Sequence, residues 1–133
     1  MQSRAADSTR WSVAVGTGLL RLVVGAALWR WRDAAMRAAG ARTDDRVMRL
    51  LFRYFAVRDA AVGVVTLAAS RPGGDVESCL LAQAVADTTD AGLVTAVTAA
   101  GRLPRWRGRG AVGLAAGTAA AEYAGWFALR RSR

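Results

Sequence analysis

The stretch CLLAQAVADTTDAGLVTAVTAA, residues 79–100, is made mostly of apolar and small residues, yet Asp87 and Asp90 lie close to its middle. A helix of about 20 residues is about 30 Å long, which matches the hydrocarbon core of a bilayer. A charge at the bilayer centre costs about 2.5–3.5 kcal/mol on insertion scales, so charges kept there indicate a functional site. The stretch therefore predicts a transmembrane helix with a polar site at mid-depth.

Three other stretches repeat this pattern of a long apolar segment with an ionisable residue near its midpoint. They cover about residues 11–29, 50–69 and 110–129, and their midpoints hold Arg21, Asp59 and Glu122. A chain of 133 residues has room for one domain. We therefore predict an all-α polytopic membrane protein, in which residues 1–133 form a single bundle of four transmembrane helices.

Tryptophan placement and overall hydropathy give different indications about this membrane assignment. Trp11 and Trp29 bracket the first segment, as residues at the two membrane interfaces would. The mean hydropathy, however, is only +0.18, and the chain is richer in Ala and Gly than in Leu and Ile. A helical bundle outside the membrane is therefore the alternative.

The basic residues are unevenly distributed along the chain. All 19 are arginines, the net charge is +9, and ten of the arginines fall in the predicted loops 30–49 and 101–109. The positive-inside rule places these loops in the cytoplasm of a multi-pass cell-membrane protein, with membrane lipids as partners. We expect no nucleic-acid partner, because the sequence has no recognition motif and no basic face interleaved with exposed aromatic residues.

The residue types present exclude several kinds of chemistry. Cys79 is the only cysteine and there is no histidine, so the chain has neither an internal disulfide nor a zinc-type cluster nor a Ser-His-Asp arrangement. We find no phosphate loop and no dinucleotide-binding glycine pattern, so no cofactor and no metal are expected. A site for a hard cation built only from carboxylates stays open as an alternative.

Helical spacing gathers the ionisable residues onto defined faces. Gln83, Asp87 and Asp90 follow each other at intervals of four and three, which puts them on one face of a helix. Arg21 shares a face with Gly18 and Gly25, so a neighbouring helix or a ligand can approach its guanidinium closely. The candidate acid–base residues are Asp59, Asp87, Asp90 and Glu122, and the candidate substrate-binding residues are Arg21, Arg58 and Gln83.

These faces contain more carboxylates than guanidinium groups. Two arginines can neutralise two of the four carboxylates, which leaves a surplus of two if all six groups share one buried site. Burial and like charge both raise a carboxyl pKa, so at least one of these groups is expected to be protonated at neutral pH, unless a cation or partner takes the proton's place. The functional interpretation is an acid–base or proton-carrying site, and the structural interpretation is a salt-bridge network that fixes the packing of the bundle.

The last predicted helix carries small residues at every fourth position, namely Gly113, Gly117, Ala121 and Gly125. Such a seam lets two helix backbones approach closely. It predicts a packing surface within the chain, or a contact with a second copy or a partner membrane protein.

Three stretches carry a resemblance to a known group of proteins: GLLRLVVGAAL at 18–28, DRVMRLLFRYFAVRDAAVGVVTL at 45–67 and ADTTDAG at 86–92. They resemble an uncharacterised family of small four-helix integral membrane proteins from high-GC actinobacteria. Arg21, Arg58, Asp59, Asp87 and Asp90 carry the resemblance, which covers nearly the whole chain. It implies a four-helix membrane bundle and supplies no activity.

Three functions are compatible with these residues. The first is the binding, or acid–base transformation by isomerisation or cyclisation, of a lipophilic small molecule. The second is proton-coupled transport of a small molecule, and the third is an accessory role in a larger membrane complex. We expect the first, because it requires no residue types beyond those present.

Overall fold

A computed structural model describes residues 2–71 and 73–131 of the chain. This part of the chain contains five helices. In chain order they are α1 (Gln2–Arg30), α2 (Arg32–Ala38), α3 (Arg46–Ala69), α4 (Val76–Ala99) and α5 (Arg105–Arg131). The all-α prediction is confirmed, and the four predicted segments correspond to α1, α3, α4 and α5, with only Ala100 lying beyond the end of its helix. The short helix α2 lies within the segment predicted to be a loop.

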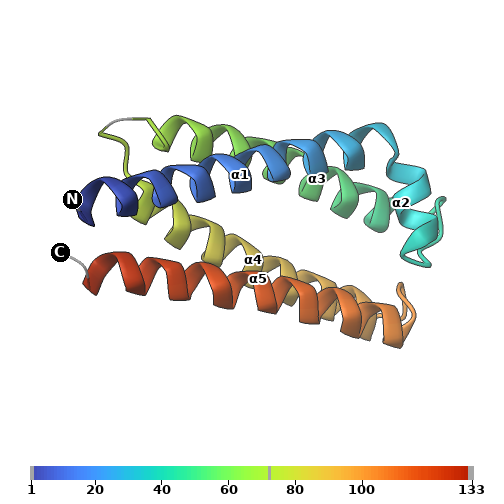
Figure 1. The fold of residues 1–133 in the computed structure, drawn as a ribbon. Helices are drawn as coiled ribbons and strands as arrows, with labels where there is room; N and C mark the ends of the chain where they lie inside the picture. The colour runs from blue at the N-terminus through green and yellow to red at the C-terminus, as the bar shows by residue number, and fades with distance from the viewer. Residues whose placement is uncertain (1, 72, 132–133) are drawn as a thin grey trace.

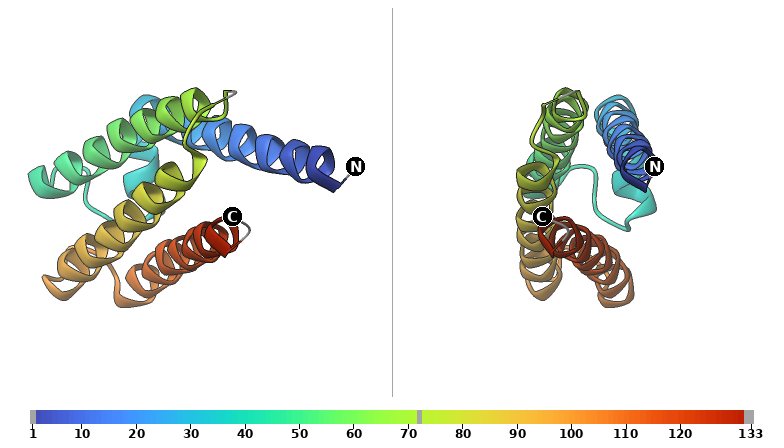
Figure 2. Two further views of the ribbon diagram at one scale, coloured as in Figure 1. Left: turned by 90° about the vertical axis from the view of Figure 1, so that its left-hand side faces the viewer. Right: turned by 60° about the vertical axis from the view of Figure 1, so that its left-hand side comes forward.

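The four long helices form two antiparallel pairs. Helix α1 packs along α3, and α4 packs along α5, while contacts between the pairs are sparser. Figure 1 shows one pair above the other, with both chain ends at the same end of the molecule. In the views of Figure 2, the two pairs diverge from each other instead of forming one parallel bundle.

Glycines set the close contact inside the α1–α3 pair. A Cβ atom added to Gly63 would lie 2.7 Å from the carbonyl oxygen of Gly18, and one added to Gly25 would lie 2.7 Å from the carbonyl oxygen of Ala56. Both distances are shorter than a side chain tolerates. The absence of side chains at these positions therefore allows the two backbones to touch, and we call this contact the glycine seam.

The apolar core lies at the end of the molecule that α2 covers. Met36 of α2 and Met48 of α3 are completely buried, and they cluster with Ala41, Val94 and Leu103. Helix α3 begins at this cluster, where the Asp45 carboxylate caps the helix by accepting hydrogen bonds from the backbone N–H groups of Val47 and Met48. This core ties the two helix pairs together at one end.

The membrane assignment is wrong. In the described part of the chain, no helix combines the length and the apolar content that crossing a bilayer requires. The reason is composition: each long helix is interrupted by polar residues near its middle, and many remaining positions are Ala, Gly or Thr instead of Leu or Ile. The polytopic membrane fold and the multi-pass cell-membrane location, with loops 30–49 and 101–109 in the cytoplasm, are therefore not supported. The membrane-lipid partners stay a prediction.

Candidate functional site

All seven residues singled out in the sequence meet in one network between the two helix pairs. Helix α1 contributes Arg21, α3 contributes Arg58 and Asp59, α4 contributes Gln83, Asp87 and Asp90, and α5 contributes Glu122. We call these seven residues the charge cluster. The four long helices each provide at least one member, as the midpoint pattern predicted.

Arg21 is the central donor of the charge cluster. Its guanidinium donates to Asp59 at 3.0 Å, to Asp87 at 2.8 Å and to Glu122 at 2.6 Å. A further N–H, from Nε, donates to the Gln83 side-chain carbonyl at 3.1 Å. A single side chain of α1 thereby contacts side chains from the other three long helices.

Arg58 is the second donor of the charge cluster. It lies 2.6 Å from Asp59 and 3.0 Å from Asp90, and it also donates to the second carboxylate oxygen of Asp87. Asp87 thus bridges the two guanidinium groups, one on each oxygen. With its side chain 7% exposed, Asp87 is the most enclosed of the four carboxylates.

Thr66 extends the network, and the sequence interpretation did not include it among the candidate residues. The amide nitrogen of Gln83 donates to the Thr66 hydroxyl at 2.8 Å, and that hydroxyl donates in turn to the Val62 carbonyl at 2.7 Å. Both Thr66 and Gln83 are buried. Thr66 lies on α3 one turn beyond Gly63, on the same face as Asp59, so its helical spacing was the available signal.

Three buried polar atoms of the cluster have no hydrogen-bond partner in the described part of the chain. They are one carboxylate oxygen of Asp90, one of Glu122, and the Nε atom of Arg58. Buried polar groups are nearly always satisfied, so unpaired ones call for an explanation such as catalysis or a bound group. The charge cluster therefore contains two unpaired acceptors, on Asp90 and Glu122, and one unpaired donor, on Arg58.

The carboxyl groups of the cluster differ in acidity. Burial raises the pKa of Asp90 to about 6, with the negative charges of Asp87 and Asp59 adding to the effect and Arg58 opposing it. Burial also raises the pKa of Glu122, against the hydrogen bond from Arg21. For Asp87, burial favours the neutral form, but hydrogen bonds from Arg21 and Arg58 outweigh it and hold the pKa below its ordinary value. The charge of Asp90 therefore changes near pH 6.

The charge cluster does not form a metal site. Among the described residues, no three Asp, Glu or Cys side chains are arranged to hold a metal ion. The guanidinium groups of Arg21 and Arg58 already pair with the carboxylates of the cluster, since they contact both oxygens of Asp87 and one oxygen each of Asp59, Asp90 and Glu122. The alternative of a carboxylate-only cation site is therefore not supported.

The small-residue seam of α5 does not pack against the described part of the chain. Added Cβ atoms at Gly113 and Gly117 would have no neighbour within 4 Å, and both glycines and Ala121 are exposed. Only at Gly125 would a Cβ meet a side chain, that of Leu80 at 3.5 Å. The close approach of α4 and α5 occurs instead at Gly108, which packs against Thr98.

Comparison of the chain with protein-family models, with curated proteins and with solved structures gives no match. The resemblance to a family of small actinobacterial proteins stays a prediction.

Proposed function

We propose that the charge cluster binds a small, largely apolar molecule that carries a basic or hydrogen-bond-donating group, and exchanges a proton with it. One observation carries this proposal: four carboxylates and two guanidinium groups share one buried network, and two of the carboxylate oxygens have no partner. A cation or a neutral donor would satisfy an unpaired oxygen, and a cation would also offset the surplus negative charge.

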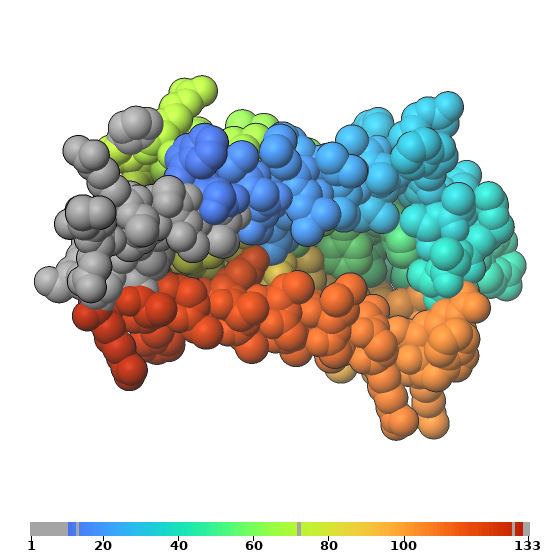
Figure 3. Space-filling model, viewed as in Figure 1, coloured from blue at the N-terminus to red at the C-terminus, as the bar shows by residue number. Residues whose placement is uncertain are grey.

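The surroundings of the cluster suit a ligand with an apolar body. Ala84, one turn before Asp87, and Ala119, one turn before Glu122, are both buried and offer small apolar walls. Figure 3 shows a hollow between α1 and α5, with parts of α3 and α4 visible inside it. The ion pair of Arg21 and Glu122, at 2.6 Å, connects these two helices, so a ligand that enters between α1 and α5 would meet this part of the cluster first.

The proposed chemistry is a proton shift within a bound molecule that carries, beside its donor group, a β,γ-unsaturated carbonyl group. Asp90, with a pKa of about 6, can remove a proton from a carbon atom next to a carbonyl group. The electron pair then resides on the carbonyl oxygen, where the unpaired N–H of Arg58 Nε can stabilise it. Return of this proton from Asp90 to the γ carbon moves the double bond into conjugation with the carbonyl group, which completes an isomerisation without a cofactor.

A role as a partner-binding subunit is the second candidate, and the exposed seam of α5 favours it. A partner chain could cover Gly113, Gly117 and Ala121. Proton-coupled transport is not retained, because it requires membrane-spanning helices and the described part of the chain has none.

The binding part of the proposal is tested with octylamine, octanol and octanoate, which share one apolar chain and differ in charge. Titrations followed by ¹⁵N NMR at pH 7.5 are expected to show the strongest perturbation of α4 near Gln83 and Asp87 with octylamine and the weakest with octanoate. Octylamine is also expected to lower the pKa of Asp90, since a bound cation favours the ionised carboxyl.

The matched variants are Asp90→Asn with Glu122→Gln, and Asp33→Asn with Asp44→Asn, whose carboxylates are exposed and lie outside the cluster. The first pair should abolish the preference for octylamine, and the second should leave it intact. Equal binding of the three probes to the wild-type cluster, or a preference that survives in the first pair, contradicts the proposal.

A further inference from the structure

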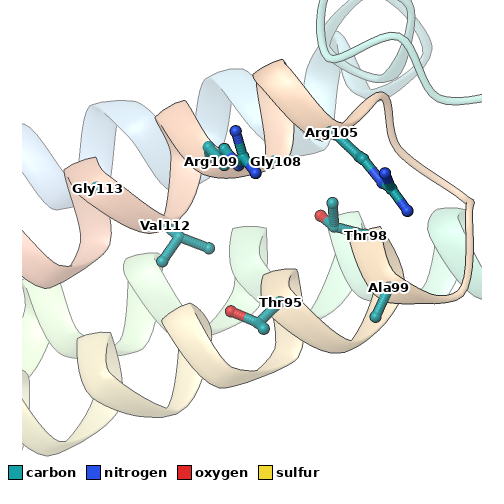
Figure 4. A pocket seen from close by; sticks show the side chains of 8 residues that line it. All are labelled: Thr95, Thr98, Ala99, Arg105, Gly108, Arg109, Val112 and Gly113. Atoms are coloured by element: carbon teal, nitrogen blue, oxygen red, sulfur yellow. The ribbon is translucent and has the colours of Figure 1, made fainter.

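A second candidate site lies away from the charge cluster, in a groove between the last turns of α4 and the first turns of α5. Its volume is about 490 Å³, which lies within the usual range of about 300–1,000 Å³ for small-molecule pockets. Figure 4 shows Thr95, Thr98 and Ala99 from α4 on one side of the groove and the residues of α5 on the other. We call it the arginine groove.

The walls of the arginine groove are apolar although two threonines line it. The hydroxyls of Thr95 and Thr98 each donate to a carbonyl of their own helix at 2.7 Å, those of Ala91 and Val94 respectively, so these hydroxyls are already engaged. Val112 adds an apolar side chain. Gly108 packs against Thr98 where the helices meet, whereas Gly113 has nothing within 4 Å of an added Cβ, so the groove widens toward it.

Two arginines stand at the rim of this apolar groove without a counter-charge. Arg105 and Arg109 are one helical turn apart, both line the groove, and both are exposed. Neither has an ion pair in the part of the chain that the structure describes. Their neighbours are engaged, since Arg102 pairs with Asp45 at 2.6 Å and Arg107 donates to the Ala38 carbonyl at 2.6 Å.

Arg105 and Arg109 lie in the first turns of α5, where the helix itself adds to the positive electrostatic potential at the rim of the groove. The N-terminal end of a helix carries a partial positive charge, and the first turn of α5 contains no acidic residue to offset it. In Figure 4 the Arg105 side chain extends from α5 toward the end of α4. A carboxylate at the rim could therefore contact a guanidinium while an attached apolar chain lies between Thr95 and Val112.

We propose that the arginine groove binds a monomeric anionic amphiphile, a carboxylate with an apolar chain of medium length. Arg105 and Arg109 hold the carboxylate by charge-assisted hydrogen bonds, and the groove walls cover the chain. This site is independent of the charge cluster and has the opposite charge preference.

The test uses octanoate, octanol and acetate, with ¹⁵N NMR of the whole protein at pH 7.5. Octanoate is expected to perturb Thr98, Gly108 and Gly113 in a saturable manner, and to bind more tightly than octanol, which lacks the charge, or acetate, which lacks the chain. Arg105→Gln with Arg109→Gln is expected to weaken octanoate binding about five-fold and to leave octanol binding nearly unchanged.

Two matched controls distinguish specific binding in the arginine groove from nonspecific electrostatic or hydrophobic binding. Arg49→Gln with Arg53→Gln removes the same charge at the same helical spacing from the exposed side of α3, and it should leave octanoate binding unaltered. Gly113→Leu should fill the groove and block octanoate, whereas Gly117→Leu, one turn further along α5, should not. The proposal is overturned if octanoate perturbs other helix faces instead, or if both arginine pairs or both leucine variants behave alike.

Discussion

The glycine seam inside the α1–α3 pair and the charge cluster between the two helix pairs hold the molecule together by opposite means. At the seam, Gly18, Gly25 and Gly63 lack side chains, so backbone meets backbone and only shape decides the fit. At the cluster, Arg21 and Arg58 reach across the interface to carboxylates on other helices. The seam should therefore be insensitive to pH and salt, whereas the cluster should respond to pH.

The largest expected effect is at the charge cluster, from Arg21→Gln. This change removes the guanidinium that contacts Asp59, Asp87 and Glu122, and it leaves buried carboxylates without their counter-charge. Breaking a buried ion network in this way costs about 3 kcal/mol in the free energy of unfolding, measured by urea denaturation. Arg42→Gln, which removes an exposed arginine paired with Asp44, is the control and should change stability little. Similar losses in the two variants would show that the cluster does not hold the pairs together.

The next effect is at the glycine seam, from Gly63→Ala. The added Cβ would lie 2.7 Å from the Gly18 carbonyl oxygen and 2.9 Å from the Leu22 backbone nitrogen, so α1 and α3 must separate. The clash should outweigh the better helix propensity of alanine and leave a net loss of about 1–2 kcal/mol, equal at pH 5 and pH 8. Gly92→Ala, at an exposed position of α4 with nothing nearby, is the control and should not destabilise the protein. A tolerated Gly63→Ala would mean that the seam is looser than its geometry indicates.

The third effect sharpens the difference in pH response between the two contacts. Asp90 has a folded-state pKa of about 6, raised from 3.8, so its neutral form is favoured in the folded protein. The contribution of Asp90 to the free energy of unfolding is therefore fully present below about pH 3.8, declines as the pH rises through 6, and is absent at pH 8. Asp90→Asn removes the charge, so it should stabilise the protein by about 1 kcal/mol at pH 8, allowing for solvent screening, and by nothing at pH 4.

Thermal unfolding at the two pH values measures this difference. The control is Asp44→Asn, which removes an exposed carboxylate. The pKa of Asp44 is lowered by its hydrogen bond from Arg42, whereas the pKa of Asp90 is raised. The effect of Asp44→Asn at pH 8 should not be stabilising. Equal effects of Asp90→Asn at pH 4 and pH 8 would show that folding does not raise the pKa of Asp90.

Helical spacing was sufficient to predict the membership of the charge cluster. Gln83, Asp87 and Asp90 lie on one face because intervals of four and three return to the same side of a helix, and the structure turns this face toward Arg21 and Arg58. Both oxygens of Asp87 accept hydrogen bonds, whereas one oxygen of Asp90 has no partner. The sequence could not show this difference, because it depends on distances between helices. The same limit applies to the arginine groove, whose two sides come from different helices.

The membrane prediction failed because one sequence pattern has two physical explanations. Apolar segments with a central charge are expected when helices cross a bilayer around a polar site, and equally when helices pack their charges against each other. Length and arginine placement favoured the first explanation, and composition, rich in Ala, Gly and Thr, decided against it. Helix α2 was missed because its arginines suggested a loop, although Met36 in its middle is completely buried.

The smallest expected effect is at Gly117 of α5, where the same small-residue pattern as in the glycine seam lies exposed. In a single chain, Gly117→Ala should stabilise the protein by about 0.5–1 kcal/mol, because alanine is the better helix former and an added Cβ meets nothing. If a second copy or another chain packs on this face, the added methyl group would instead weaken that contact. Light scattering of the wild type and of Gly117→Leu over a range of concentrations distinguishes the two cases. A mass that falls in the variant means that this seam joins chains in the way that the glycine seam joins α1 to α3, whereas an unchanged monomer mass leaves the exposed pattern without a role in self-association.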